Sequence, residues 1–356
     1  MKIAIIGYGG MGNNHRKYII PRLNDSDYPE KLEIAGIYDI SEERKEFAAQ
    51  LGLHNFDSAE QIFADESIKI VLIATPNDLH KPYALEAMSR GKNVIVEKPM
   101  GMNTEEVNQM YAAAEKYGKV FTVHQNRRWD DDFLTVKNIY DKKLLGDVYL
   151  IESRVMGSNG IPGEWRKEEA RGGGMMLDWG IHLIDQMLLT VDDKVASVQC
   201  DYSYREGEEV DDGFDLLVKF RGGMRYRIVV DTNCFIELPR WQIYGTDGTG
   251  TVTNWRRDNV EGRMVRVTQR YDDKLEGVNA GNGFTKTMAA RRAETQIELP
   301  LEIVRGDKNA FYRNFMNAVL KGEKTTVTQQ QELRAYAVME AAKKSSDENR
   351  VIELDV

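Results

Sequence analysis

Two side chains that together could move a proton lie four positions apart, at Asp178 and His182. On a helix this spacing places them on one face, one turn apart. A carboxylate beside an imidazole can orient the ring and raise its basicity, which makes a general acid or base. Asp185 falls on much the same side, and Gly180 predicts a close approach of ligand to the helix backbone. A buried helix with a hydrogen-bonded His–Asp pair explains these residues equally well.

The composition limits the class of protein. The chain has 356 residues, 42% of them hydrophobic and 29% charged, with a net charge of −9. The length favours about two domains, and the acidic balance argues against nucleic acid or an anionic membrane as the main partner. Apolar runs are too short for a membrane span. Cys200 and Cys234 lie in strand-like segments without metal-ligand spacing, which predicts buried thiols, no metal site and a cytoplasmic location.

A glycine-rich loop follows the first predicted strand. Residues 2–6 are apolar, as in a strand buried on both faces, and residues 13–20 can form a helix. The loop between them carries the GxGxxG pattern, with Gly7, Gly9, Gly10, Met11 and Gly12. The first glycine allows a tight turn, the second lets the backbone reach a pyrophosphate, and the third permits close helix–strand packing. Placed between a strand and a helix, the pattern predicts a dinucleotide site.

Asp39 ends the second predicted strand. A carboxylate there accepts hydrogen bonds from ribose hydroxyls and repels a 2′-phosphate, which favours NAD over NADP. It comes later than the usual spacing because a polar insert occupies residues 24–30. Asp39 could instead be a turn or cap residue, since a helix start is predicted at Ser41. Arg44 is a nearby cation that could weaken the preference for NAD.

Strands and helices continue to alternate up to residue 125. The pattern predicts strands at 68–74, 93–96 and 119–123 and helices at 81–90 and 104–117. This alternation indicates an α/β Rossmann domain, a doubly wound parallel sheet whose ligands bind beyond the carboxyl ends of the strands.

Two loops at that edge of the sheet carry candidate site residues. The first contains Ala74, Thr75, Pro76, Asn77 and His80, and the second contains Glu97, Lys98 and Pro99. The Lys98 ammonium could polarise a substrate oxygen. A surface pair between Lys98 and Glu97 is the alternative. His80 could contact ribose or phosphate, or only cap a helix.

The second domain is predicted at residues 126–328 as an α+β unit with a large, mostly antiparallel sheet. Strands are expected at 147–156, 195–205, 213–220, 224–233, 240–245 and 249–254, and helices at 130–145, 175–189 and 311–320. A C-terminal helix at about 329–347 is expected to dock on the first domain. Residues 256–296 are polar and poorly periodic, so Lys286, Arg291 and Arg292 are expected in a solvated loop, with substrate or subunit contacts as the alternative.

The order of these motifs resembles the Gfo/Idh/MocA oxidoreductases, named for glucose–fructose oxidoreductase and inositol dehydrogenase. The pieces that match are Gly7–Gly12, Ala74–Asn77 with His80, Glu97–Pro99, Asn126–Arg128, and Gly172–Gly174 with Asp178, Gly180, His182 and Asp185. The resemblance implies that Lys98, Asp178 and His182 are catalytic. It also implies cofactor contacts from Asn126, Trp165 and Arg166, substrate contacts from Arg127 and Trp165, and a homo-oligomer formed through the second-domain sheet.

The combined prediction is an NAD-dependent dehydrogenase acting on a secondary alcohol of a sugar, glycoside or cyclic polyol. Trp129, Trp165 and Trp179 are candidate surfaces for stacking on a sugar ring. A narrower hypothesis is oxidation at C3 of a glucoside, with NAD held between turnovers. The alternatives are a redox-neutral NAD-dependent glycosidase or lyase, a non-catalytic NAD-binding sensor, and an NADP-dependent reductase.

Overall fold

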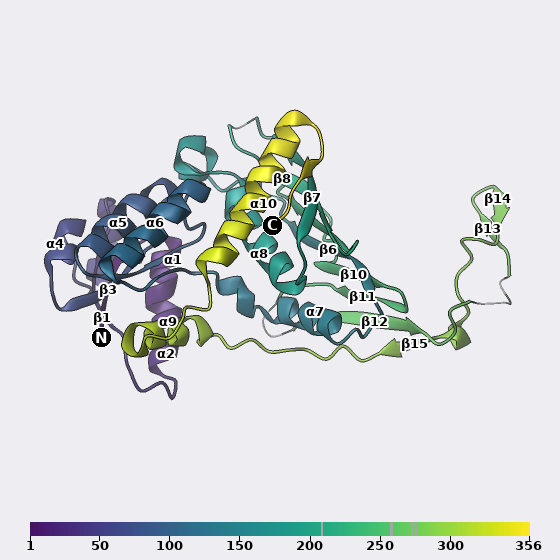
Figure 1. Cartoon of the computed structure of the whole chain (residues 1–356), viewed down its shortest axis with the longest axis horizontal. Coiled ribbons are helices and arrows are strands. Elements are labelled where there is room, and N and C mark those ends of the chain that lie inside the picture. The colour runs from purple at the N-terminus through teal and green to yellow at the C-terminus, as the bar shows by residue number, and fades with distance from the viewer. Residues whose placement is uncertain (208, 257–258, 272–273, 275) are drawn as a thin grey trace.

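The computed structural model describes residues 1–356 with the exception of 208, 257–258, 272–273 and 275. Two units lie side by side, and helix α10 (Gln329–Glu348) runs between them (Figure 1). Among the described residues, no helix is long and apolar enough to cross a membrane.

The first unit is a parallel sheet, which confirms the doubly wound prediction. Its strands are β1 (Lys2–Ile6), β2 (Glu33–Tyr38), β3 (Ile68–Ile73), β4 (Asn93–Val96) and β5 (Phe121–Val123), in the order β2-β1-β3-β4-β5. The central strands are apolar and buried because helices cover both faces. The order reverses between β1 and β3, so the loops after these strands diverge and leave a crevice for a ligand.

The helices of this unit begin soon after the strand ends. They are α1 (Gly10–Asn14), the π-helical η1 (His15–Ile19), α2 (Ile20–Asn24), α3 (Glu42–Gln50), α4 (Ala59–Ala64), the 3-10 turn η2 (Asn77–Leu79), α5 (His80–Ser89) and α6 (Thr104–Tyr117). Asn103 caps α6 through a bond to the backbone N–H of Glu106, and Gly118 ends it in the left-handed conformation.

The second unit is built on a nine-stranded sheet. Its strands are β6 (Val148–Met156), β7 (Val195–Ser203), β8 (Gly213–Phe220), β9 (Arg225–Asp231), β10 (Trp241–Gly245), β11 (Gly248–Val252), β12 (Gly262–Val267), β15 (Gln296–Leu299) and β16 (Ile352–Glu353). The β6–β9 pair is parallel and the other described neighbours are antiparallel, as predicted. Helices α7 (Asp131–Asp141) and α8 (Ile181–Thr190), with the π-helical η6 (Met176–Gly180) before α8, lie on one side of this sheet (Figure 1).

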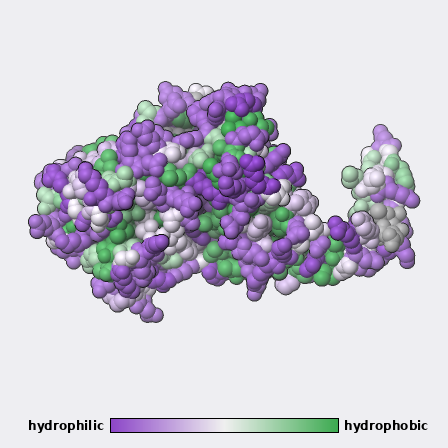
Figure 2. All heavy atoms as spheres, viewed as in Figure 1, coloured by the Kyte–Doolittle hydropathy of each residue, from purple (hydrophilic) through white to green (hydrophobic). Residues whose placement is uncertain are grey.

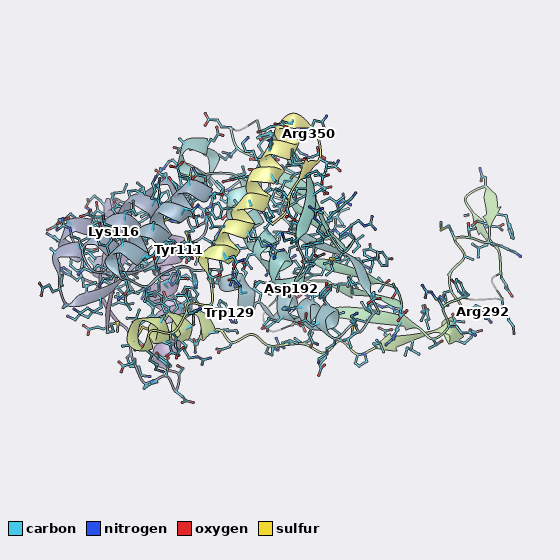
Figure 3. The ribbon with its side chains drawn as sticks, viewed as in Figure 1. Tyr111, Lys116, Trp129, Asp192, Arg292 and Arg350 are labelled. Atoms are coloured by element: carbon cyan, nitrogen blue, oxygen red, sulfur yellow. The ribbon has the colours of Figure 1, made fainter. Side chains whose placement is uncertain are left out.

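The prediction of a solvated loop over 256–296 is wrong in part. Strand β12 and the start of β15 fall in this range and extend the sheet. The segment between them carries a small hairpin, β13 (Val278–Ala280) and β14 (Gly283–Thr285), on an arm that stands away from a largely hydrophilic body (Figure 2). Arg291 donates to the carbonyls of Gln269 and Arg270 where the arm begins. Arg292, at the base of the arm in Figure 3, pairs with Glu294.

The C-terminal part of the chain returns to both units. Helix α9 (Ala310–Lys321) reaches the first domain, where the Tyr312 hydroxyl lies 2.7 Å from Nδ1 of His15. Helix α10 packs on α6 of the first domain, where Tyr336 bonds to both backbone groups of Gly101. It also packs on β7 and α8 of the second domain, where the Ser345 hydroxyl accepts from the backbone N–H of Cys200.

The two cysteines have different surroundings. Cys200 is buried in β7, and burial raises the pKa of its thiol. The expectation of a buried strand position for Cys234 is wrong, because this residue follows the end of β9 and is only partly buried.

Candidate active site

A cavity of about 700 Å³ opens at the carboxyl ends of β1 to β4. Most residues predicted for the cofactor line it: Gly7, Gly9, Gly10, Met11, Asp39, Ala74, Thr75, Pro76, Asn77, Glu97, Lys98, Trp165 and Arg166. Gly12, His80 and Asn126 lie outside its described lining. The loops after parallel strands therefore converge on one space, although they are far apart in the sequence.

Two of the glycines are required by close backbone packing. A Cβ on Gly12 would lie 2.1 Å from the carbonyl oxygen of Gly7, so a side chain there would separate the helix from the strand. Gly7 has φ +88°, and its Cβ would meet the Ala74 carbonyl. Gly10 has open space beside it, which leaves room for a ligand. The loop thus has the shape that a pyrophosphate needs.

The end of the cavity formed by β2 and the start of α3 carries the acids Asp39 and Glu43 and the cation Arg44. Asp39 is buried, and its carboxylate accepts from the backbone N–H of Tyr8 at 2.6 Å and of Ser41 at 2.9 Å. Arg44 on α3 lies 3.8 Å from the same carboxylate and also lines the cavity. The acid that repels a 2′-phosphate is therefore partly balanced by a cation that could attract one.

Lys98 connects the two domains at the inner end of the cavity. It follows β4, and its Nζ donates to Asp178 Oδ1 at 2.6 Å and to the Asp178 backbone carbonyl at 2.8 Å. Burial alone would raise the pKa of Asp178, but the Lys98 ammonium outweighs burial and lowers it. Both side chains line the cavity, so an ammonium and a carboxylate face a bound ligand together.

The Lys98 ammonium is bonded to Asp178 and Glu97 is buried, so Lys98 and Glu97 do not form the surface pair considered above. Glu97 Oε1 lies 2.6 Å from His15 Nε2 and 2.8 Å from His124 Nδ1. Burial would raise the pKa of Glu97, but the two histidines hold it well below its usual value. These three side chains also form a donor set of the kind that binds metals. Positions 15, 97 and 124 gave no sign of the cluster because only the fold brings them together.

His182 has a different partner from the one expected. Within the described residues its Nδ1 lies 3.2 Å from Gln125 Oε1, while Asp178 is bonded to Lys98. Burial lowers the pKa of His182 well below its usual value, and the Lys98 and Arg127 cations lower it further. The ring is therefore neutral near pH 7 and able to accept a proton.

Gly180 serves packing and not ligand access, so the earlier interpretation of it is wrong. A Cβ on Gly180 would meet the Met176 sulfur at 2.5 Å and the Phe214 ring at 3.3 Å. These neighbours are core residues on η6 and β8, which shows that the glycine lets the helix approach the sheet.

Asp185 has a structural partner. It receives two hydrogen bonds from the Arg128 guanidinium, at 2.6 and 2.8 Å, and both side chains are about 5% exposed. Arg128 also donates to the Thr326 carbonyl and to Gln331. Asp185 therefore ties α8 to the C-terminal segment and does not line the cavity.

Three further predicted site residues, His80, Arg166 and Asn77, make contacts around the cavity. His80 is fully buried and its ring nitrogens lie 2.8 and 3.0 Å from the carbonyls of Pro99 and Thr75, which joins two site loops. Arg166 stacks on Trp165 at the cavity mouth, 4.7 Å from the ring centroid. Asn77 donates to the carbonyl of Gly172 at 2.7 Å, which links the first domain to the glycines before η6.

An aromatic cluster lies next to His182. Trp179 stacks on Trp255 with centroids 5.2 Å apart, and the Arg127 guanidinium lies 4.3 Å from the Trp179 centroid. Trp255 was not predicted, because it follows β11 in a polar stretch without a motif. Trp129, one of the predicted stacking surfaces, instead packs against Phe311.

The glycine cradle, the cavity at the strand ends and the Lys98–Asp178 pair are features of a nicotinamide-dependent oxidoreductase. Comparison with known proteins agrees with this. Residues 1–125 match the oxidoreductase family with an NAD-binding Rossmann fold, and residues 133–251 match the GFO/IDH/MocA C-terminal domain. The chain belongs to the Gfo/Idh/MocA family.

Three similar proteins illustrate the range of the family. The crystal structure of an NAD-binding protein from Listeria innocua has 39% identity, covers 99% of both chains and superposes with a TM-score of 0.91. The scyllo-inositol 2-dehydrogenase (NADP(+)) of Bacillus subtilis is 26% identical over 360 residues, which is 100% of this chain and 96% of the relative. The D-glucoside 3-dehydrogenase of Escherichia coli is 28% identical over 190 residues, 52% of each chain.

Because the Arg128–Asp185 pair is buried, we expect a large loss of stability when one of the two partners is neutralised. Asp185→Asn should lower the free energy of unfolding by about 3–5 kcal/mol, because it leaves Arg128 buried without its counter-charge. Urea unfolding measures this. The matched control is Asp215→Asn in the bidentate Arg227–Asp215 pair, which is 46% and 40% exposed and should cost less than about 1 kcal/mol. Equal losses in the two variants would contradict this assignment.

Proposed function

We propose that the protein is an NAD-dependent dehydrogenase that oxidises a secondary alcohol of a sugar, glycoside or cyclic polyol. The observation that carries the proposal is the Lys98–Asp178 pair, which joins the two domains with Nζ and Oδ1 2.6 Å apart and lines the dinucleotide cavity. The inositol and glucoside dehydrogenases among the relatives support this substrate class. The stacked Trp179 and Trp255 rings offer an apolar wall for the carbon face of a sugar.

The reaction needs one hydride acceptor and one proton acceptor. Bound NAD⁺ supplies the nicotinamide that takes the hydride. Lys98 binds the substrate hydroxyl oxygen and stabilises the charge that develops on it. His182 accepts the hydroxyl proton as the carbinol C–H bond breaks, so the products are a ketone, NADH and a protonated imidazole that releases its proton to water. Asp178 holds the Lys98 ammonium at the oxygen.

A narrower form of the proposal is oxidation at C3 of a glucoside, with the cofactor retained between turnovers. The Escherichia coli relative acts on D-glucosides at this position, by its name. Product analysis on a panel of inositols, sugars and glycosides decides it, and oxidation only at other carbons would contradict it.

Lys98→Ala tests the assignment of the catalytic group. Turnover should fall by about 10³-fold, because the substrate oxygen loses the ammonium that stabilises its developing charge, while NAD affinity by titration calorimetry changes little. The control is Lys81→Ala, which breaks a Lys–carboxylate pair with Glu106 at 3.0 Å outside the cavity and should keep full activity. Full activity of the Lys98→Ala enzyme would contradict the assignment of Lys98 to the catalytic group.

We infer a preference for NAD over NADP from Asp39. Asp39→Asn keeps an acceptor for the Tyr8 N–H but removes the charge that repels a 2′-phosphate. The ratio of the NADP and NAD dissociation constants should therefore shift toward NADP by about tenfold. The exposed Glu42→Gln is the control. A wild-type enzyme that binds NADP more tightly, as the name of the Bacillus subtilis relative would suggest, refutes the inference.

We also propose that the protein forms a homo-oligomer through the nine-stranded sheet. On the neighbouring strands β6 and β10 of the sheet, Tyr149, 45% exposed, lies beside Tyr244, with ring centroids 6.3 Å apart. The arm adds Phe284 and Met288, which are 68% and 82% exposed. Light scattering that gives a monomer mass would contradict this.

A further inference from the structure

Gln125 lies between His182 and the C-terminal helix. It follows β5, and its Oε1 is 3.2 Å from His182 Nδ1. Its Nε2 is 3.3 and 3.4 Å from the two carboxylate oxygens of Glu332, in the first turn of α10. The exposed fractions of Gln125, Glu332 and His182 are 1%, 0% and 4%. These side chains therefore form a buried chain of hydrogen bonds that leads from α10 to His182.

The directions of these hydrogen bonds follow from the groups involved. An ionised carboxylate only accepts, so Gln125 must turn its NH₂ group toward Glu332 and its carbonyl oxygen toward His182. A carbonyl oxygen also only accepts, so His182 Nδ1 must carry the hydrogen. A neutral imidazole has one N–H, which leaves the lone pair on Nε2.

We propose that Gln125 and Glu332 are positioning residues that hold His182 in the tautomer whose Nε2 can accept the substrate proton. This rests on the proposed role of His182 as general base. A carboxylate is needed at position 332 because a neutral amide there could donate or accept, and Gln125 could then present either of its ends to the ring. Glu332 is 207 residues from Gln125 in the chain, so the C-terminal helix sets the chemistry of a residue that it does not touch through any described hydrogen bond.

The groups around Glu332 determine when it is ionised. Arg128 on the 3-10 turn η3 (Asn126–Trp129), Asp185 on α8, Tyr111 on α6 and Tyr336 on α10 all interact with it electrostatically. Tyr111 is visible beside α10 in Figure 3. Burial raises the pKa of Glu332 to about 8, Asp185 adds to this, and Arg128 opposes it. Because the raised pKa belongs to an acid, the ionised form that orients Gln125 is present above that pH and is lost below it.

The tautomer can be read directly by NMR. Protein labelled with ¹⁵N-histidine gives distinct shifts for protonated and unprotonated ring nitrogens, and its five histidines can be assigned by single substitutions. Measured without substrate at about pH 9, where Glu332 is ionised, wild-type His182 should show a protonated Nδ1 and an unprotonated Nε2. The population of this tautomer should fall as the pH is lowered through the pKa of Glu332.

Glu332→Gln should populate both tautomers and remove their pH dependence. In the oxidation assay at about pH 9, where wild-type Glu332 is ionised, kcat should fall by roughly two- to tenfold with little change in KM, in proportion to the fraction of enzyme that presents a protonated Nε2 to the substrate. The matched control is Glu340→Gln on the same helix, whose exposed side chain accepts from the Thr104 N–H at 2.8 Å. Glu340→Gln should leave the tautomer populations of His182 and kcat unchanged.

Exchanging the side chains of Gln125 and Glu332 distinguishes a positioning role of these residues from a role in packing alone. In Gln125→Glu/Glu332→Gln a carboxylate faces Nδ1 directly and the new amide donates to it, so the Nδ1–H tautomer and most of kcat should return. A wild-type His182 protonated on Nε2 at high pH would overturn the proposal even if the variants failed to fold. So would a Glu332→Gln enzyme with wild-type tautomer and kcat. Because the tautomer is measured without substrate, an enzyme that oxidised no sugar would refute the proposed function and still leave this result decided.

Discussion

The ion pair between Lys98 and Asp178 is the interaction on which the site depends. Lys98 lies in the loop after β4 of the first domain and Asp178 lies in η6 of the second, and their side chains are 16% and 22% exposed. In such partly desolvated surroundings each charge needs its partner, so the pair favours one relative position of the domains. The same pair lines the cavity, so the contact that holds the domains together also presents an ammonium to the ligand.

Behind this pair, buried polar groups fix the orientation of the residues proposed to be catalytic. Glu97 is held by two histidines and accepts from the backbone N–H of Lys98 at 3.3 Å, which fixes the residue that carries the ammonium. The Tyr312 hydroxyl on α9 completes this cluster, and Glu332 on α10 completes the one behind His182. A buried polar network specifies geometry only when each member has a partner. The last two helices, which carry no catalytic motif, therefore build the site as much as the glycine loop does.

The sequence was most informative where function depends on local geometry. The glycine loop, the parallel sheet and the loops after β3 and β4 follow from short-range patterns, because strand, turn and helix are neighbours in the chain. Strands β12 and β15 were missed because charged and polar residues alternate with apolar ones inside a largely polar stretch, and pairing across the sheet stabilises them. The partner of His182 was also missed. Asp178 has the correct helical spacing, but Lys98 engages it, and Gln125 is brought to the ring only by the fold.

The central claim is that a hydride leaves a carbinol carbon in this site for the nicotinamide, with Lys98 and His182 serving the oxygen. Deuterium tracing tests it most directly. Inositols, sugars and glycosides that carry deuterium at all of their carbinol carbons together are incubated with the enzyme and NAD. The ketone and NADH are analysed by mass spectrometry. The account predicts one deuterium in each NADH formed, matched by one ketone. Deuterium released to water, or ketone formed with unlabelled NADH, would contradict it.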